Sequence, residues 1–267
     1  MTPTPPAPVP AQVDDAPHPG LFITFEGGDG VGKSTQIDRL ATLLVAAHLD
    51  YVRTREPGGT ELGAEVRRLV LHGGHVDPRA EALLYAADRA HHVATKVRPA
   101  LQAGSVVISD RYLDSSVAYQ GAARCLGPGE VRDLSLWATD GLLPDLTILL
   151  DAEPGVAERR RVERGAKDRL EREPDAFHTA LREEFLALAA LEPERFVVID
   201  AELDAETVAR LVATNVGRVI ARRGEHLRSE DAEVAVDTQG TAATPADAVR
   251  GAVLRRYPDL TAPELGW

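Results

Sequence analysis

The sequence predicts an α/β fold in which a five-stranded parallel sheet is flanked by helices on both faces. Short, almost purely apolar segments alternate with longer segments of helical periodicity, as expected for strands that are buried on both faces. A glycine-rich loop also follows the first apolar segment and precedes a helix. The expected strands are residues 21–25, 51–54, 105–110, 146–150 and 196–200.

Capping signals mark the beginning of several expected helices. Thr60 is a favourable N-cap for a helix over 60–72, and Asp77 followed by Pro78 opens a long helix that continues to about residue 103. The remaining expected helices are residues 129–139, 153–164, 174–190 and 204–222.

The composition describes a globular domain with an extension at each end. The chain has 267 residues, of which 44% are hydrophobic and 27% charged. Residues 1–19 are rich in proline and are expected to form a disordered tail. Residues 20–223 contain the whole expected sheet, whereas 224–267 combine a linker-like segment with an appended helix through Val249 and Val253. The sequence does not indicate a role for this second extension.

Charge and cysteine content argue against several classes of protein. The net charge of −12 disfavours a protein that coats nucleic acid. No apolar run is long enough for a membrane span, and the N-terminus lacks a basic region followed by an apolar one. The single cysteine, Cys125, favours a reducing compartment. We therefore expect a cytoplasmic protein whose partners include neither nucleic acid nor a membrane.

A phosphate-binding loop is the most specific local signal. Residues Gly27 to Ser34 match the pattern G-x-x-x-x-G-K-[ST], in which backbone N–H groups and the N-terminus of the next helix surround phosphates. Lys33 would reach the terminal phosphates, and the Ser34 hydroxyl would bind Mg²⁺. The residues expected to bind ATP are Gly27, Gly28, Asp29, Gly30, Val31, Gly32, Lys33, Ser34 and Thr35.

Polar residues stand at the ends of several predicted strands. Glu26, Arg55, Asp110 and Asp151 each end or directly follow a strand. Because ligands of parallel sheets bind at the carboxyl ends of the strands, these residues are expected to converge on one site.

Several motifs, in the same order along the chain, resemble those of the thymidylate kinase family, which phosphorylates dTMP to dTDP with ATP. The resemblance runs from Phe22 to about Val219. It implies a P-loop nucleoside monophosphate kinase fold, Mg²⁺ as cofactor and, as is usual in the family, a homodimer with helices 60–72 and 78–103 near the contact. The motifs are residues 25–34, 55–60, 83–89, 110–112, 118–121 and 144–147.

The resemblance assigns the acceptor base to one face of a helix. Tyr85 and Arg89 stand four residues apart and therefore share a face, where a ring can stack on a base and a guanidinium can donate to its carbonyl groups. The family often has phenylalanine at the position of Tyr85. The alternative is a core tyrosine beside a surface arginine.

The resemblance also assigns the acceptor phosphate and the metal. Asp110 would hold Mg²⁺ through water, and Arg111 would contact the acceptor phosphate with help from Arg55. The simpler alternative for each arginine is an ordinary ion pair at the end of a secondary-structure element.

A carboxylate inside a phosphate loop requires an explanation. Asp29 would repel phosphates, and the resemblance suggests that it accepts a hydrogen bond from the 3′-hydroxyl of the acceptor sugar. Ser115, Ser116, Tyr119 and Gln120 would close the sugar and base pocket, with Tyr119 as the candidate for excluding a 2′-hydroxyl. The alternative for this group is a polar turn and helix start.

A basic segment at about 155–172 is identified by the resemblance as a lid over the triphosphate. The phosphate loop carries Gly30 where other members of the family have a basic residue, so the chain resembles the bacterial subtype that supplies its catalytic arginine from the lid. Arg164 is the first candidate and Arg160 the second. The alternative is a solvated, charged helix.

The expected chemistry is in-line phosphoryl transfer without a general base, because the acceptor is already an anion at neutral pH. Lys33, Mg²⁺, Arg111 and a lid arginine would position the groups and neutralise charge. Two alternatives remain open at this stage. One is a P-loop kinase for another nucleotide or a deoxynucleoside, and the other is a nucleotide-dependent switch or binding module.

Overall fold

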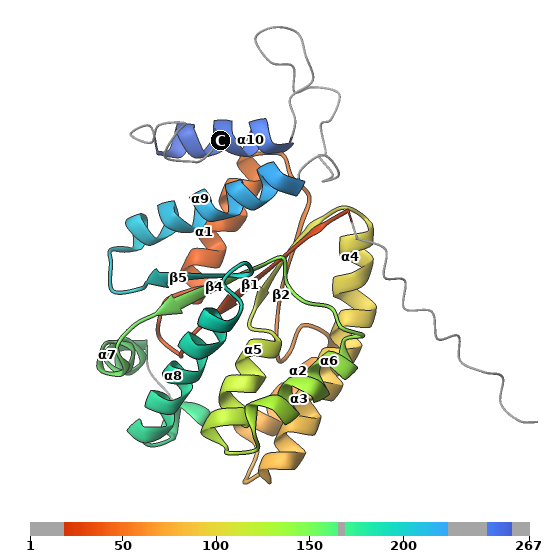
Figure 1. The fold of residues 1–267 in the computed structure, drawn as a ribbon, viewed down its shortest axis with the longest axis vertical. Helices are drawn as coiled ribbons and strands as arrows, with labels where there is room; N and C mark the ends of the chain where they lie inside the picture. Colours follow the sequence, from red (N-terminus) through yellow and green to blue (C-terminus); the bar gives the residue numbers. More distant parts are fainter. Residues whose placement is uncertain (1–18, 165–168, 224–244, 258–267) are drawn as a thin grey trace, which may run out of the picture.

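The computed structural model describes residues 19–164, 169–223 and 245–257. The expected disordered tail, the central part of the expected lid and the expected linker therefore lie outside the described residues, except for Pro19 at the end of that tail. A parallel five-stranded sheet forms the centre of the molecule, with helices on both faces (Figure 1). This confirms the predicted fold class.

The strand order β2-β3-β1-β4-β5 places β1 in the middle of the sheet. Phe25 in β1 is in register with Asp110 in β3, and Arg55 in β2 is in register with the same aspartate. The polar residues at the strand ends therefore share one edge, as predicted. The strands are β1 (Leu21–Glu26), β2 (Tyr51–Arg55), β3 (Val106–Asp110), β4 (Leu146–Asp151) and β5 (Phe196–Asp200).

The helices divide into two layers. One layer packs α1 and α9 against one face of the sheet, with α10 on the outer side of these two helices, and the other layer contains α2, α3, α5, α6 and α8 (Figure 1). The helices are α1 (Lys33–Ala46), α2 (Glu61–His72), α3 (Pro78–His92), α4 (Arg98–Gln102), α5 (Leu113–Ser116), α6 (Pro128–Ala138), α7 (Pro154–Arg164), α8 (Asp175–Leu191), α9 (Ala205–Arg223) and α10 (Pro245–Arg256). Shorter π and 3₁₀ segments are η1 (Val93–Val97), η2 (Val117–Ala123) and η3 (Leu170–Arg172).

The predicted caps are present. Thr60 Oγ1 accepts a hydrogen bond from the Gly63 N–H at 3.0 Å, and Asp77 Oδ1 accepts one from the Arg79 N–H at 2.9 Å. The long helix predicted over 78–103 is not a regular α-helix, because the π-helical segment η1 separates α3 from α4. Pro99 follows this segment, and its missing N–H interrupts the α-helical hydrogen-bond pattern there.

The appended helix α10 packs on α1 and α9. Val249 and Val253 are completely buried in the same apolar cluster as residues of α1 and α9. At the edge of this contact, Glu206 of α9 forms ion pairs with both Arg39 of α1 and Arg256 of α10. The sequence predicted this helix but not its site of attachment.

No helix in the described part of the chain combines the length and the apolar character that a membrane crossing requires.

Candidate active site

The phosphate loop curls tightly between β1 and α1. Gly27 has φ +121°, and a Cβ atom there would lie 2.3 Å from the backbone oxygen of Leu150. Gly30 and Gly32 also have positive φ values, of +89° and +98°. Only glycine adopts this path without strain, so the glycines are required by the backbone and not only by a ligand.

The side chain of Lys33 contacts the backbone of the phosphate loop. Its Nζ donates hydrogen bonds to the backbone oxygens of Gly27 at 3.0 Å and Gly28 at 2.7 Å. Burial and the nearby Arg111 lower the pKa of Lys33 to about 8. A phosphate group would replace these neutral acceptors with charged ones, which strengthens hydrogen bonds and favours the ammonium form.

The two expected metal-binding side chains meet at the carboxyl end of β3. Ser34 Oγ donates to Asp110 Oδ2 at 3.4 Å, and both residues line a cavity of about 1070 Å³. A hydroxyl and a carboxylate are oxygen ligands of the kind that Mg²⁺ prefers, with water completing its coordination. The residues present therefore fit a magnesium ion.

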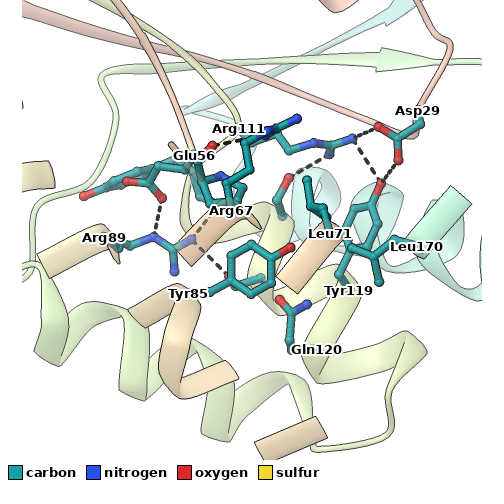
Figure 2. Close-up of a pocket in the computed structure, with 14 residues that line it drawn as sticks. Asp29, Glu56, Arg67, Leu71, Tyr85, Arg89, Arg111, Tyr119, Gln120 and Leu170 are labelled. Carbon is teal, nitrogen blue, oxygen red and sulfur yellow. Dashed lines mark hydrogen bonds and ion pairs between the residues drawn. The ribbon is translucent and has the colours of Figure 1, made fainter. Parts of the chain in front are cut away.

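Two adjoining cavities make up the site, and Figure 2 shows the residues that line the smaller one. Asp29, Glu56, Arg67 and Arg111 line both of them. The larger cavity is also lined by Gly30, Gly32, Lys33, Ser34, Thr35, Arg55, Asp110, Arg160 and Glu171. The smaller, of about 500 Å³, is also lined by Pro57, Leu71, Tyr85, Arg89, Tyr112, Ser115, Ser116, Tyr119, Gln120 and Leu170.

Arg111 occupies the boundary between the cavities. Its Nη1 donates to the Gly27 backbone oxygen and to Ser115 Oγ, both at 2.9 Å, and its Nη2 donates to Asp29 Oδ1 at 2.6 Å and to the Tyr119 hydroxyl at 3.0 Å. Its backbone has φ +72°, a strained value for a residue with a side chain. A turn that neither periodicity nor composition reveals therefore aims this arginine at the phosphate loop.

The unusual carboxylate of Asp29 is neutralised by its neighbours. Burial by itself would raise its pKa, but Arg111 and Lys33 outweigh this effect and hold the pKa of Asp29 well below its usual range. Tyr119 also donates to Asp29 Oδ2 at 2.7 Å. The ionised carboxylate therefore forms part of a compensated cluster, and the predicted contact with a sugar hydroxyl stays a prediction.

Glu26 stabilises the turn at Arg111 through buried hydrogen bonds. It is completely buried and accepts hydrogen bonds from the Tyr112 N–H at 2.7 Å and from Ser115 Oγ at 2.5 Å. Burial, assisted by the nearby Asp114, raises the pKa of Glu26 to about 8. Sequence reasoning located this residue at the strand end but assigned it no role.

Tyr85 and Arg89 both face the smaller cavity, as their spacing predicted (Figure 2). The alternative of a surface arginine is wrong, because Arg89 is only 1% exposed. Its Nε donates to Glu56 at 2.7 Å, and its other nitrogens donate to the side chains of Ser135 and Ser116 and to the backbone oxygen of Tyr112. Arg89 is thus held rigidly before any base arrives.

The arginines of the expected lid segment lie in different places. Arg160 lines the larger cavity and donates to the backbone oxygen of Ala201 at 2.8 Å. Arg164 is the last residue of α7, and its side chain lies outside the described atoms. Arg169 is bound to Glu81 and to the Val70 backbone oxygen, away from the phosphate loop.

Three charged residues that line the cavities were not predicted from the sequence. Glu56 fixes Arg89 and also accepts a hydrogen bond from His92 Nδ1 at 2.8 Å. Arg67 borders both cavities from α2, and Glu171 is buried beside the larger one. Glu56 lies within the motif at residues 55–60, so the sequence offered a reason to place it in the site. Arg67 belongs to an ordinary amphipathic helix, and no sequence pattern marks it as a site residue.

Comparison with known proteins identifies relatives over most of the chain. The family model described as thymidylate kinase matches residues 25–212. A thymidylate kinase of Leifsonia xyli subsp. xyli is 62% identical over 205 residues, covering 76% of this chain and 97% of that protein. The thymidylate kinase of Clavibacter michiganensis subsp. michiganensis is 59% identical over 204 residues, with 76% and 97% covered. That of Bifidobacterium longum is 54% identical over 202 residues, with 74% and 97% covered.

Proposed function

The chain belongs to the thymidylate kinase family, and we propose that it transfers the γ-phosphoryl group of ATP to dTMP, which yields dTDP and ADP. The observation that carries this proposal is the pair of adjoining cavities, one lined by a phosphate loop and the other by the acceptor motifs. Arg111 and Asp29 stand at their junction, where the transferred group would pass.

The donor side would take ATP with Mg²⁺. Backbone N–H groups of the loop and the N-terminus of α1 suit the phosphates, and Lys33 would exchange its backbone acceptors for phosphate oxygens. When bound, Mg²⁺ at Ser34 and Asp110 would neutralise charge on the triphosphate. Arg160 lines the same cavity, and Arg164, one turn further along α7, would approach when the lid closes.

The acceptor side would take the nucleotide in the smaller cavity. The Tyr85 ring would stack on the base, with Arg89 and Gln120 at its polar edge. The 3′-hydroxyl would donate to Asp29, and the Tyr119 ring would leave no room for a 2′-hydroxyl. The acceptor phosphate would lie against Arg111, with Arg55 on the side of the larger cavity.

The reaction needs positioning and charge neutralisation more than proton transfer. The acceptor phosphate is ionised at neutral pH, so its oxygen is already a nucleophile and no side chain has to remove a proton. Arg111 and Lys33, which both line the larger cavity, would supply positive charge to the transferred group. Closing the lid excludes water, which would otherwise accept the phosphoryl group.

We propose a homodimer in which α2, α3 and α6 form the contact. Leu62 and Leu69 of α2 and Leu83 of α3 are large apolar residues that are exposed on this layer, and Trp137 of α6 is 80% exposed. A second copy would cover them, because α2 packs on α3 and α3 on α6, so these exposed apolar residues stand on neighbouring helices. Light scattering of the purified protein tests this, and a monomer at micromolar concentration would contradict it.

A cytoplasmic location is proposed because the chain has a single cysteine, which favours a reducing compartment.

A panel of acceptors tests the proposed activity. ADP formation is measured with ATP and Mg²⁺ in the presence of dTMP, dUMP, dCMP or AMP, and Lys33→Met serves as the inactive control. We expect the highest kcat/KM with dTMP. Faster turnover of another acceptor would assign the enzyme to that substrate. ATP hydrolysis that no acceptor stimulates would favour a nucleotide-dependent switch.

A further inference from the structure

Glu81 is a completely buried carboxylate next to the acceptor cavity. It lies on α3 four residues before Tyr85 and eight before Arg89, so the three residues follow one face of the helix. Unlike the other two, it does not line the cavity itself, and the proposed mechanism does not use it. Its contacts indicate what it does instead.

The two oxygens of Glu81 bind different elements. Oε1 accepts a hydrogen bond from Gln120 Nε2 at 2.8 Å, in a fully buried contact between α3 and η2. Oε2 pairs with Nη2 of Arg169, which lies near the C-terminal end of the expected lid segment. Arg124 approaches Oε1 to 3.6 Å and binds Glu173 at 2.7 Å, so two carboxylates and two guanidinium groups compensate one another.

The Glu81 contact determines which atom of Gln120 faces the base. An ionised carboxylate accepts hydrogen bonds and donates none, so the amide nitrogen of Gln120 must point to Glu81. The Gln120 side chain points into the cavity between Tyr85 and Tyr119 (Figure 2). Its amide oxygen is then the polar atom that faces a bound base. An oxygen in this place accepts from a base that carries hydrogen on N3, and cytosine has none.

We propose that Glu81 is a positioning residue for base selection, which locks the Gln120 amide in the orientation that accepts a hydrogen bond from N3–H of the acceptor base. This inference rests on the proposed function, because it requires a pyrimidine nucleotide in the smaller cavity. It predicts that a neutral side chain at position 81, which can donate as well as accept a hydrogen bond, allows the Gln120 amide to rotate by half a turn. The turned amide offers N–H, which suits the bare N3 of cytosine.

The same carboxylate also holds the end of the cavity in place. Arg169 donates from Nε to the Val70 backbone oxygen at 2.8 Å and from its backbone N–H to the Leu71 oxygen at 3.3 Å. Leu71 and Leu170 line the smaller cavity beside this contact. Loss of the Glu81–Arg169 ion pair could therefore alter the cavity by itself, and the experiment has to separate this effect from the orientation of Gln120.

Two variants make that separation. Arg169→Gln breaks the ion pair but keeps the Glu81 carboxylate on Gln120. Glu81→Gln/Arg169→Gln has the same broken pair and additionally frees the amide, and removing both charges together avoids an uncompensated buried arginine. Steady-state kinetics with ATP and Mg²⁺ then give kcat/KM for dTMP and dCMP in each variant and in the wild type, and thermal unfolding confirms that each variant is folded.

We expect the preference for dTMP over dCMP to fall about tenfold or more in the double variant relative to Arg169→Gln, which corresponds to the loss of one hydrogen bond. The change should lie mainly in KM for dTMP, with kcat less affected. Glu81→Asp is the second test: it keeps the charge but draws the carboxylate back from Gln120, and the preference should fall in the same direction.

An equal preference in the double variant and in Arg169→Gln would overturn the role of Glu81 while leaving the proposed activity intact. If the double variant does not fold, an unchanged preference in Glu81→Asp would overturn the role in the same way. A wild-type protein that does not phosphorylate dTMP would instead overturn the proposed function, and the inference with it.

Discussion

Replacing Arg89 should destabilise the fold as well as weaken substrate binding. The side chain is 1% exposed and forms a buried ion pair with Glu56, whose side chain is 2% exposed. Arg89→Met removes four hydrogen bonds and leaves Glu56 buried beside His92 without a permanent positive charge. Breaking one half of such a pair costs about 3–5 kcal/mol, which is a large part of the ~5–15 kcal/mol that holds a domain folded.

The assay is urea unfolding followed by far-UV circular dichroism. With an m-value of about 2–3 kcal/mol/M, the loss corresponds to a midpoint lower by roughly 1–2.5 M. Arg68→Met is the matched control, because Arg68 pairs with Glu65 at 3.0 Å on the surface, where both side chains are about two-thirds exposed. Such exposed pairs contribute ~0.2–0.5 kcal/mol, so its midpoint should hardly move.

A double variant separates charge burial from lost packing. Arg89→Met/Glu56→Gln removes both charges, and we expect it to recover part of the stability that Arg89→Met loses. The reasoning is refuted if Arg89→Met and Arg68→Met lower the midpoint equally. It is also refuted if the double variant is less stable than Arg89→Met.

Three further predictions follow from the site and the core. Arg164→Ala should lower kcat by about 10³-fold with little change in KM for dTMP, and near-normal turnover would transfer the role to Arg160. Val253→Asp places a charge where α10 is completely buried, and it should lower the thermal midpoint by several degrees, whereas an unchanged midpoint would mean that α10 does not pack there. Folding raises the pKa of Glu26 from 4.5 to about 8, so between these pH values the folded state holds a proton on Glu26 that the unfolded state has lost. The protonated carboxyl therefore stabilises the folded state fully below about pH 4.5, and this stabilisation is lost as the pH rises to about 8. Unfolding free energies of the wild type should therefore decline with pH across this window more steeply than those of Glu26→Gln, and parallel curves would contradict the shift.

Local patterns were enough to predict the framework of the molecule. Apolar strands, the glycine spacing of residues 27–34 and the caps at Thr60 and Asp77 depend on residues close together in the chain, and each is present as expected. Two exceptions among the helices are η1, where Pro99 made the expected long helix irregular, and residues 113–123, which form α5 and η2 outside the helices that were predicted. Motif order then identified the family, which the comparisons confirm.

The sequence by itself therefore determined the fold class, the phosphate loop and the set of residues at the strand ends. Tertiary structure alone decided which charges meet: Asp29 with Arg111 across the loop, Arg89 with Glu56 in the core, and Glu81 with Gln120 at the base pocket. The physical reason is that periodicity and turn preference act over a few residues, whereas these partners are 33 to 82 positions apart. Their pairing depends on strand register and helix packing, which no local pattern encodes.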